Sequence, residues 1–263
     1  MRVRKCAAFV AALALGAVLA VGAPAGASQP TKKKPLLRIL VTNDDGVTAP
    51  GIDALVEALR ELPRVKVTVV GPATNQSGTS DKTTPGSLVT TESTTESGYP
   101  AVAVPGYPAD SVNVALDTGL VKKPHVVISG VNQGQNLGAL TDVSGTVGAA
   151  RTAARRGIPA LAVSQGLGEP PDYAAGAAAA VTWLKEHRKE LERKAPSGDV
   201  LLENLNVPTC TVGEMRGVVD APIATSADNA IGPSDCASTL TDPVDDIQAF
   251  ANGFAVVSTL STG

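Results

Sequence analysis

The sequence predicts an α/β fold in which a mostly parallel sheet is covered by helices on both faces. Short β-branched runs alternate with amphipathic segments along most of the chain, and each run ends in Gly, Pro or Asn. The first run, Leu36 to Thr42, is almost continuously hydrophobic, as expected of a strand buried on both faces. These observations predict a Rossmann-like three-layer sandwich. From Val200 onward the alternation fades, so we expect a β-rich C-terminal extension of the same domain.

The individual elements follow from the spacing of apolar residues. Pro50 to Leu62 has them at helical spacing, and Val65 to Val70 is a second strand, so the strand, helix, strand order implies parallel pairing. Residues 71–98 are rich in Thr, Ser and Gly, which predicts a long active-site loop with a short hairpin around 87–91. The remaining expected elements are strands at 101–104, 125–129, 160–164, 200–207 and 253–260, and helices at 109–120, 144–156 and 173–193.

The first 27 residues read as a secretory signal peptide. Three basic residues lead an apolar stretch that ends in Ala25-Gly26-Ala27 before Ser28, an A-x-A cleavage pattern. A membrane anchor is the alternative, but glycines interrupt the stretch, which is shorter than the roughly 20 residues of a spanning helix. We therefore expect a secreted or extracytoplasmic protein with no membrane segment after cleavage, a linker over 28–35, and one domain over 36–263 whose β-rich arm begins near 200.

The charge of the mature chain excludes some partners. Removal of Arg2, Arg4 and Lys5 with the signal leaves 19 basic residues against 25 acidic ones, a formal net charge of −6. A chain of this charge lacks the basic surface of a protein that coats a nucleic-acid duplex. The basic run at 32–34 lies in a Pro-flanked leader and is read as a solvated linker.

Two cysteines, Cys210 and Cys236, remain after cleavage. In a chain bound for an oxidising compartment a single remaining pair predicts a disulfide. A two-cysteine metal site is the alternative, but it would need histidines, and the chain has only His125 and His187.

Oxygen-bearing side chains follow several predicted strands. In parallel α/β sheets the loops at the carboxyl ends of the strands meet at one edge, so these side chains are expected to converge. They are Asp44, Asp45, Asn75, Ser77, Asn132 and Asn136. An all-oxygen set favours Mg²⁺ or Mn²⁺, with Ca²⁺ as the alternative. Taken alone, Asp45-Gly46 is equally a common turn with a solvated carboxylate.

A second candidate feature is the start of the helix expected from residue 144. Ser144, Gly145 and Thr146 place free backbone N–H groups and two hydroxyls at a helix N-terminus, where anions and above all phosphate bind. The alternative is that Ser144 only caps the helix, the commonest role of serine at that position.

Four blocks of the chain resemble the stationary-phase survival protein (SurE-like) family of metal-dependent 5'/3'-nucleotidases. The blocks are "ILVTNDDGVTAPGI", "GPATNQSGTSDKTT", "GYPADSVNVAL" and "ISGVNQGQNLGALTDVSGTVGAARTAARRGIPALAVS". The resemblance is close over residues 36–164 and continues weakly through "NLNVP" and "GFAVVSTL".

The resemblance implies a phosphomonoesterase that hydrolyses nucleoside monophosphates with water activated by one divalent ion. By residue matching, the ion's ligands are Asp44, Asp45, Ser77 and Asn132, the two aspartates being the catalytic pair. By the same matching, the residues expected to bind the phosphate or other parts of the substrate are Asn43, Asn75, Asn136, Ser144, Gly145 and Thr146. Family members are dimers or tetramers, so a homodimer or homotetramer is expected. Val143 departs from the family, which usually has an aromatic there, so base stacking beside the phosphate is expected to differ.

Other enzyme classes fit the sequence less well. A haloacid-dehalogenase-type phosphatase needs an aspartate nucleophile where this chain has Asn43, and an amide cannot form an aspartyl-phosphate. A Ser/His/Asp hydrolase is disfavoured because His187 lies in a charged helical segment and His125 precedes a buried strand. A secreted nucleotide- or polyphosphate-binding protein without turnover, and an exopolyphosphatase, stay open as alternatives.

Overall fold

The computed structural model describes residues 36–193 and 200–263. The predicted signal peptide and linker lie outside the described residues, and so do residues 194–199. None of the described helices is long and apolar enough to cross a membrane.

A single nine-stranded sheet organises the described chain, with the strand order β3-β4-β2-β1-β5-β6-β7-β9-β8. Its central strands are β1 (Leu37–Thr42), β2 (Val65–Pro72), β4 (Pro100–Val104), β5 (Val126–Gln133), β6 (Ala160–Gln165) and β7 (Leu202–Val207), and neighbours among them pair in parallel. The predicted α/β class and the mostly parallel sheet are confirmed.

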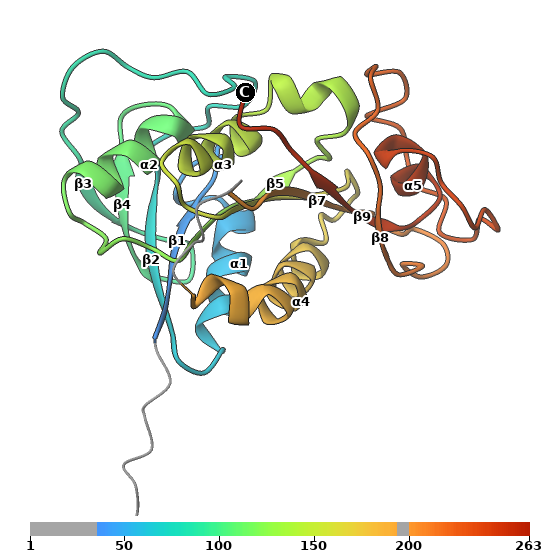
Figure 1. Cartoon of the computed structure of the whole chain (residues 1–263), viewed down its shortest axis with the longest axis horizontal. Helices are drawn as coiled ribbons and strands as arrows, with labels where there is room; N and C mark the ends of the chain where they lie inside the picture. Colours follow the sequence, from blue (N-terminus) through green and yellow to red (C-terminus); the bar gives the residue numbers. More distant parts are fainter. Residues whose placement is uncertain (1–35, 194–199) are drawn as a thin grey trace, which may run out of the picture. The chain divides into compact units, whose positions relative to one another are not determined.

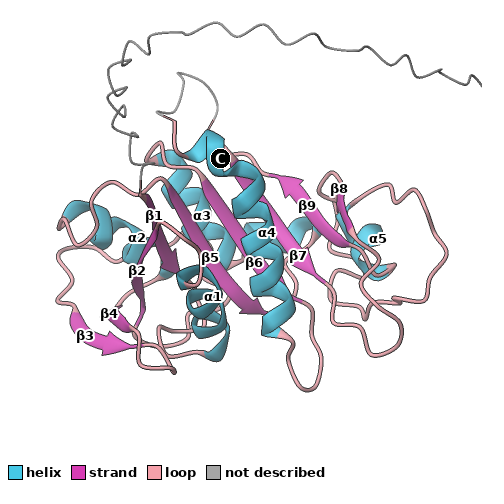
Figure 2. Ribbon diagram, turned by 90° about the horizontal axis from the view of Figure 1, so that it is seen from below, coloured by secondary structure: helices cyan, strands magenta, loops and turns pink. Residues whose placement is uncertain are grey.

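Four helices complete the three layers (Figures 1 and 2). On one face α1 (Pro50–Arg60) and α4 (Tyr173–Leu191) bury an apolar stripe against the sheet, Ile52 and Leu184 among its members. On the other face α2 (Pro108–Asp117) and α3 (Gly145–Arg155) do the same with Val112 and Val147. Each helix therefore covers the sheet through the apolar positions that predicted it.

The strand order reverses direction beside β1, and this reversal locates the site. From β1 the chain proceeds to β2 and β4 on one side, whereas β5, β6 and β7 follow on the other side. Open α/β sheets bind ligands outside the carboxyl ends of the strands at such a switch point. The loop after β1 and the end of β5 lie there, and both carry candidate residues.

The hairpin predicted around 87–91 was wrong in position. The antiparallel pair is β3 (Thr91–Thr94) with β4, and its turn contains Gly98 at a φ of +85°. The buried carboxylate of Asp53 on α1 holds this turn by accepting bonds from the Ser97 hydroxyl at 2.6 Å and the Ser97 N–H at 2.9 Å. A tertiary contact thus selects the turn.

The C-terminal region extends the main sheet and is less purely β than predicted. Its strand β9 (Ala255–Thr259) pairs antiparallel with β7, and β8 (Val218–Asp220) adds to β9 in parallel. A short helix, α5 (Asp246–Ala251), packs through Phe250 onto a small separate apolar cluster. Cys210 and Cys236 are joined by a disulfide. We call residues 208–254 the arm.

Both histidines have structural partners. His125 Nδ1 accepts the backbone N–H of Arg38 at 2.9 Å, and partial burial lowers the pKa of its imidazole. His187 Nδ1 lies 2.9 Å from the Trp183 carbonyl, and the two rings stack with centroids 4.4 Å apart.

Candidate active site

The loop after β1 turns sharply enough to present two adjacent aspartates. Asn43 is fully buried, and its Nδ2 donates to the Gly46 carbonyl at 2.8 Å, which closes the turn. Gly46 has a φ of +110°, a region that glycine adopts without strain. The sequence placed Asn43 among the substrate-binding candidates, whereas the structure buries it inside the loop, where it has no exposed surface to contact a ligand.

Asp44 is a buried carboxylate at the bottom of the site. Its Oδ1 accepts the Thr146 hydroxyl at 2.6 Å, and only 3% of the residue is exposed. Burial and, to a smaller extent, the neighbouring charge of Asp45 raise the pKa of Asp44 to about 6, and the hydrogen bond from Thr146 opposes the shift. Keeping this group ionised at neutral pH is therefore costly without a positive charge nearby.

Asp45 points toward the other two strand-end loops. Its Oδ1 accepts Nδ2 of Asn75 at 3.3 Å, and its Oδ2 accepts the backbone N–H of Gln133 at 3.3 Å. Burial raises the pKa of Asp45, and these two donors partly offset the effect. One carboxylate thus ties together the loops after β1, β2 and β5, as the sequence predicted for loops at one edge of a parallel sheet.

Two further predicted residues face the same cavity. Asp44, Ser77, Asn132 and Ser144 all line a cavity of about 250 Å³. Asn75 Oδ1 accepts the Ser77 N–H at 2.9 Å and so fixes the serine. Nδ2 of Asn132 donates to the Gly134 carbonyl at 2.6 Å, which directs the amide nitrogen away and leaves the oxygen to face the cavity. The structure therefore brings an amide, a hydroxyl and carboxylate oxygens together.

The start of α3 closes the floor of the cavity. The Ser144 hydroxyl oxygen accepts the Val147 N–H at 3.2 Å, so Ser144 is the N-cap, and it still lines the cavity with its own O–H free to donate. A Cβ on Gly145 would lie 2.8 Å from Cβ of Asp44, closer than real contacts allow. Thr146 is fully buried behind Asp44, so its hydroxyl supports that carboxylate and does not reach the cavity.

Asn136 is held by a set of side chains that the sequence reasoning missed. Its backbone N–H donates to Asn206 Oδ1 at 2.7 Å, and its carbonyl accepts Nδ2 of Asn204 at 2.8 Å. Its own Nδ2 donates to the Ser164 hydroxyl at 2.9 Å. Asn204 and Asn206 are two residues apart on β7 and so share one face of the strand. Two asparagines at this spacing in a buried part of the strand are the signal that could have found them.

The sequence and the fold are similar to those of known proteins. Residues 39–229 match the protein family described as Survival protein SurE. The chain belongs to the SurE family. Its fold agrees with the crystal structure of the SurE protein from Aquifex aeolicus, at a TM-score of 0.68 and 29% identity, over 86% of this chain and 94% of that one.

Curated members of the SurE family are similar over most of the chain. The 5'-nucleotidase SurE of Methanocella arvoryzae is 40% identical over 191 residues, which cover 69% of this chain and 71% of that protein. The 5'/3'-nucleotidase SurE of Cronobacter sakazakii is 41% identical over 182 residues, which cover 69% and 68% respectively. The family resemblance predicted from the four sequence blocks is confirmed.

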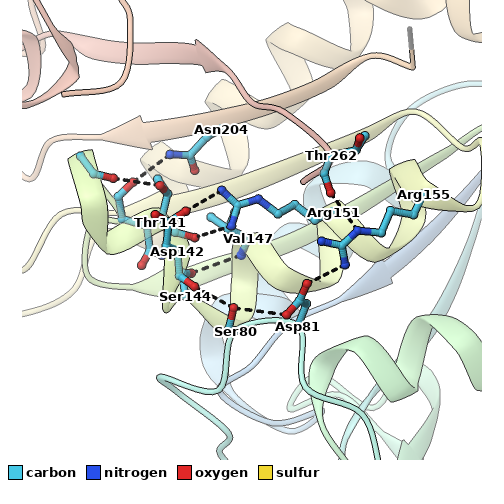
Figure 3. Close-up of polar contacts among 12 residues, drawn as sticks. Ser80, Asp81, Thr141, Asp142, Ser144, Val147, Arg151, Arg155, Asn204 and Thr262 are labelled. Carbon is cyan, nitrogen blue, oxygen red and sulfur yellow. Dashed lines mark hydrogen bonds and ion pairs between the residues drawn. The ribbon is translucent and has the colours of Figure 1, made fainter. Parts of the chain in front are cut away.

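Hydrogen bonds and an ion pair around the cavity fix the loops of this SurE-family site (Figure 3). Ser80 donates its N–H to the Val143 carbonyl at 3.0 Å and its hydroxyl to the Asp142 carbonyl at 2.7 Å. Arg155 on α3 pairs with Asp81 at 2.6 Å, and Arg151 donates to the Thr141 carbonyl at 3.1 Å. The loop that carries Asn75 and Ser77 is therefore fastened to the turn before α3 and, through Arg155, to the end of α3.

The donor set fits a hard divalent ion. Asp44, Ser77 and Asn132 line the cavity, and Asp45 is the next residue after Asp44. Burial raises the pKa of both carboxylates, and carboxylate, amide and hydroxyl oxygens together suit Mg²⁺ or Mn²⁺. Over residues 36–193 and 200–263 no cluster of three or more His, Cys, Asp or Glu side chains suited to a metal is present. The candidate ligand set contains only two carboxylates, and its other ligands are an amide and a hydroxyl, so it does not require such a cluster.

Proposed function

We propose that this SurE-family chain is a phosphomonoester hydrolase that acts on nucleoside monophosphates, with one divalent ion held by Asp44, Asp45, Ser77 and Asn132. The enzyme class follows from family membership and from relatives named as 5'-nucleotidases and 5'/3'-nucleotidases. The observation that carries the metal site is the buried Asp44 carboxylate, which lines the cavity with Ser77 and Asn132 and whose pKa burial raises to about 6. A bound cation would favour the ionised form and remove the cost of burying its charge.

The reaction needs no covalent intermediate. Water oxygen forms a new bond to phosphorus, the ester P–O bond breaks, and the leaving oxygen takes a proton. A bound ion would polarise a phosphoryl oxygen and lower the pKa of the attacking water. Thr146 keeps Asp44 oriented through its 2.6 Å hydrogen bond, and Asn75 does the same for Asp45.

The start of α3 binds the phosphate in this proposal. Helix N-termini offer backbone N–H groups that lack intrahelical partners, and the helix dipole favours an anion there. Gly145 lets this N-terminus approach Asp44 closely, so the phosphate and the ion share one cavity. The Ser144 O–H adds a donor on the same wall.

The test is phosphate release from AMP with and without a chelator. We expect activity to disappear with the chelator and to return with excess Mn²⁺ or Mg²⁺. Asp44→Asn and Asp45→Asn should each lower turnover by roughly a thousandfold or more while the circular dichroism spectrum is unchanged, because each removes a charged ligand. Asp117→Asn, on the exposed end of α2, is the matched control and should keep wild-type activity. Full activity in both site variants would contradict the metal assignment.

We also propose that the chain is exported and assembles into a homodimer or homotetramer. The N-terminal pattern of residues 1–27 and the joined cysteines support export. Fractionation of cells that express the chain with and without residues 1–27 tests the first statement, and light scattering of the purified protein tests the second.

A further inference from the structure

Apolar side chains gather on the outer wall of the catalytic cavity. Val143, Leu167 and Ile231 line it and are 53%, 57% and 70% exposed. Single exposed apolar side chains are ordinary on protein surfaces. These three come from distant parts of the sequence, namely the turn before α3, the loop after β6 and the arm, and they meet around one cavity with a polar floor. We call them the rim.

The rim is fixed in place by polar contacts beneath it. Gln135 is buried, and its Nε2 donates to the Gly232 carbonyl at 3.0 Å while its Oε1 accepts the Leu167 N–H at 3.2 Å. One amide therefore holds both the arm next to Ile231 and the loop of Leu167.

A buried carboxylate fastens the arm a second time. Asp246 on α5 accepts the Gly138 N–H and the Ala224 N–H, each at 2.8 Å. The Ala139 N–H also donates to the Ser226 carbonyl at 3.1 Å. The arm thus contacts the loop after β5 directly, and this contact holds the part of the arm that places Ile231 on the cavity wall.

Most polar side chains beside the rim are already engaged. Gln133 also lines the cavity, but it is exposed, and no hydrogen bond within the described residues fixes its side-chain amide in one position. Both ends of the Gln135 amide have protein partners, as described above, and the amide nitrogens of Asn132 and Asn136 donate to Gly134 and Ser164. Reading the edge of a nucleobase requires free donors and acceptors at fixed positions. Among the residues that line the cavity, the rim offers mainly apolar surface for the part of a substrate that extends beyond the phosphate.

We propose that Val143, Leu167 and Ile231 form a leaving-group subsite that accepts a flat, apolar or heteroaromatic group by contact alone. This rests on the proposed function, because the phosphate on the polar floor is what directs the rest of the ester toward the rim. The substrate class is then a phosphomonoester with a base or comparable ring, and the identity of the base matters little. Ile231 makes the arm a determinant of substrate affinity.

The test compares AMP with ribose 5-phosphate, which has the same phosphate ester and sugar but no base. With saturating Mn²⁺, wild-type protein should show a KM for AMP about tenfold below that for ribose 5-phosphate, and similar KM values for AMP, GMP, CMP and UMP. Ile231→Asn should raise the KM for AMP roughly fivefold and leave that for ribose 5-phosphate unchanged. Val244→Asn is the matched control, since Val244 is 69% exposed on the arm and does not line the cavity.

The outcomes separate the two proposals. Hydrolysis of neither ester by the wild-type protein would overturn the proposed function. Equal KM values for AMP and ribose 5-phosphate, or a strong preference for one base, would overturn the subsite and leave the hydrolase intact. A changed oligomeric state in Ile231→Asn, measured by light scattering, with an unchanged KM for AMP would assign the rim to contact between copies of the chain instead.

Discussion

The floor and the rim of the cavity are built in opposite ways. On the floor, Asp44 and Thr146 are buried and hydrogen-bonded, and the neighbouring groups come from the ends of strands and the start of a helix. On the rim, Leu167 and Ile231 are exposed, apolar and carried by loops. A site that holds an ion and a phosphate needs polar groups at fixed positions. A group that is recognised by apolar contact alone needs only an apolar surface of suitable shape. Changes to the floor should therefore affect turnover, and changes to the rim should affect substrate affinity.

The largest effect in this comparison is expected from Gly145→Ala on the floor. The new Cβ would lie 2.8 Å from Cβ and 2.9 Å from Oδ2 of Asp44, and rotation of the carboxylate would not relieve the contact with Cβ. We expect turnover of AMP to fall by about a hundredfold, because a displacement of this size misplaces the ligand. Gly232→Ala, beside Ile231, is the matched rim variant, since its Cβ would approach only Asn229 O at 3.2 Å. Steady-state kinetics with both variants makes the comparison, and equal losses would contradict it.

The second expected effect is a pH dependence of the ion-free protein's stability. The pKa of Asp44 is about 6 in the fold against 3.8 ordinarily, so the fold prefers the protonated form. The associated stability is present below pH 3.8 and is lost as the pH rises through 6, a change of about 3 kcal/mol in the free energy of unfolding. Urea unfolding with a chelator at pH 4 to 7.5 measures it as the difference between wild type and Asp44→Asn. With saturating Mn²⁺, the difference between the two proteins should no longer change with pH over this range. If this difference in the free energy of unfolding did not change with pH in the absence of the ion, burial of Asp44 would carry no such cost.

A smaller effect on catalysis is expected from loss of the disulfide. The bond closes a loop with a sequence separation of 26, so Cys210→Ser with Cys236→Ser should lower the free energy of unfolding by about 2–4 kcal/mol. The loop contains Ile231, so the KM for AMP should rise a few-fold while the KM for ribose 5-phosphate changes little. Thermal unfolding and the two KM values are the measurements. A large fall in turnover of both esters would mean that the arm supports the floor as well as the rim.

The floor could be predicted from the sequence to a large extent. Asp44 and Asp45 follow a strand whose hydrophobic run is continuous, and Asn132 ends another, so parallel pairing alone brings them to one edge. Local patterns also fixed α3 and its start at Ser144 within one residue. The role of Thr146 was not predictable, because which of two neighbouring hydroxyls turns inward depends on how the start of α3 meets the loop after β1.

The rim could not be predicted, and the reason is physical. Ile231 lies in a region interrupted by Gly and Pro, with no periodicity to place it. Its position depends on long-range contacts from Gln135 and Asp246, which are separated from their partners by 97 and 108 residues. The six-residue helix α5 is too short to be signalled by spacing and is stabilised by its packing through Phe250.

The most direct test of this account is calorimetric titration of Mn²⁺ into chelator-stripped protein. We predict that the wild-type protein binds one ion, that Asp44→Asn binds it at least a hundredfold more weakly, and that Ile231→Asn binds it as the wild type does. Equal affinity in the wild type and Asp44→Asn would contradict the assignment of the floor as the ion site.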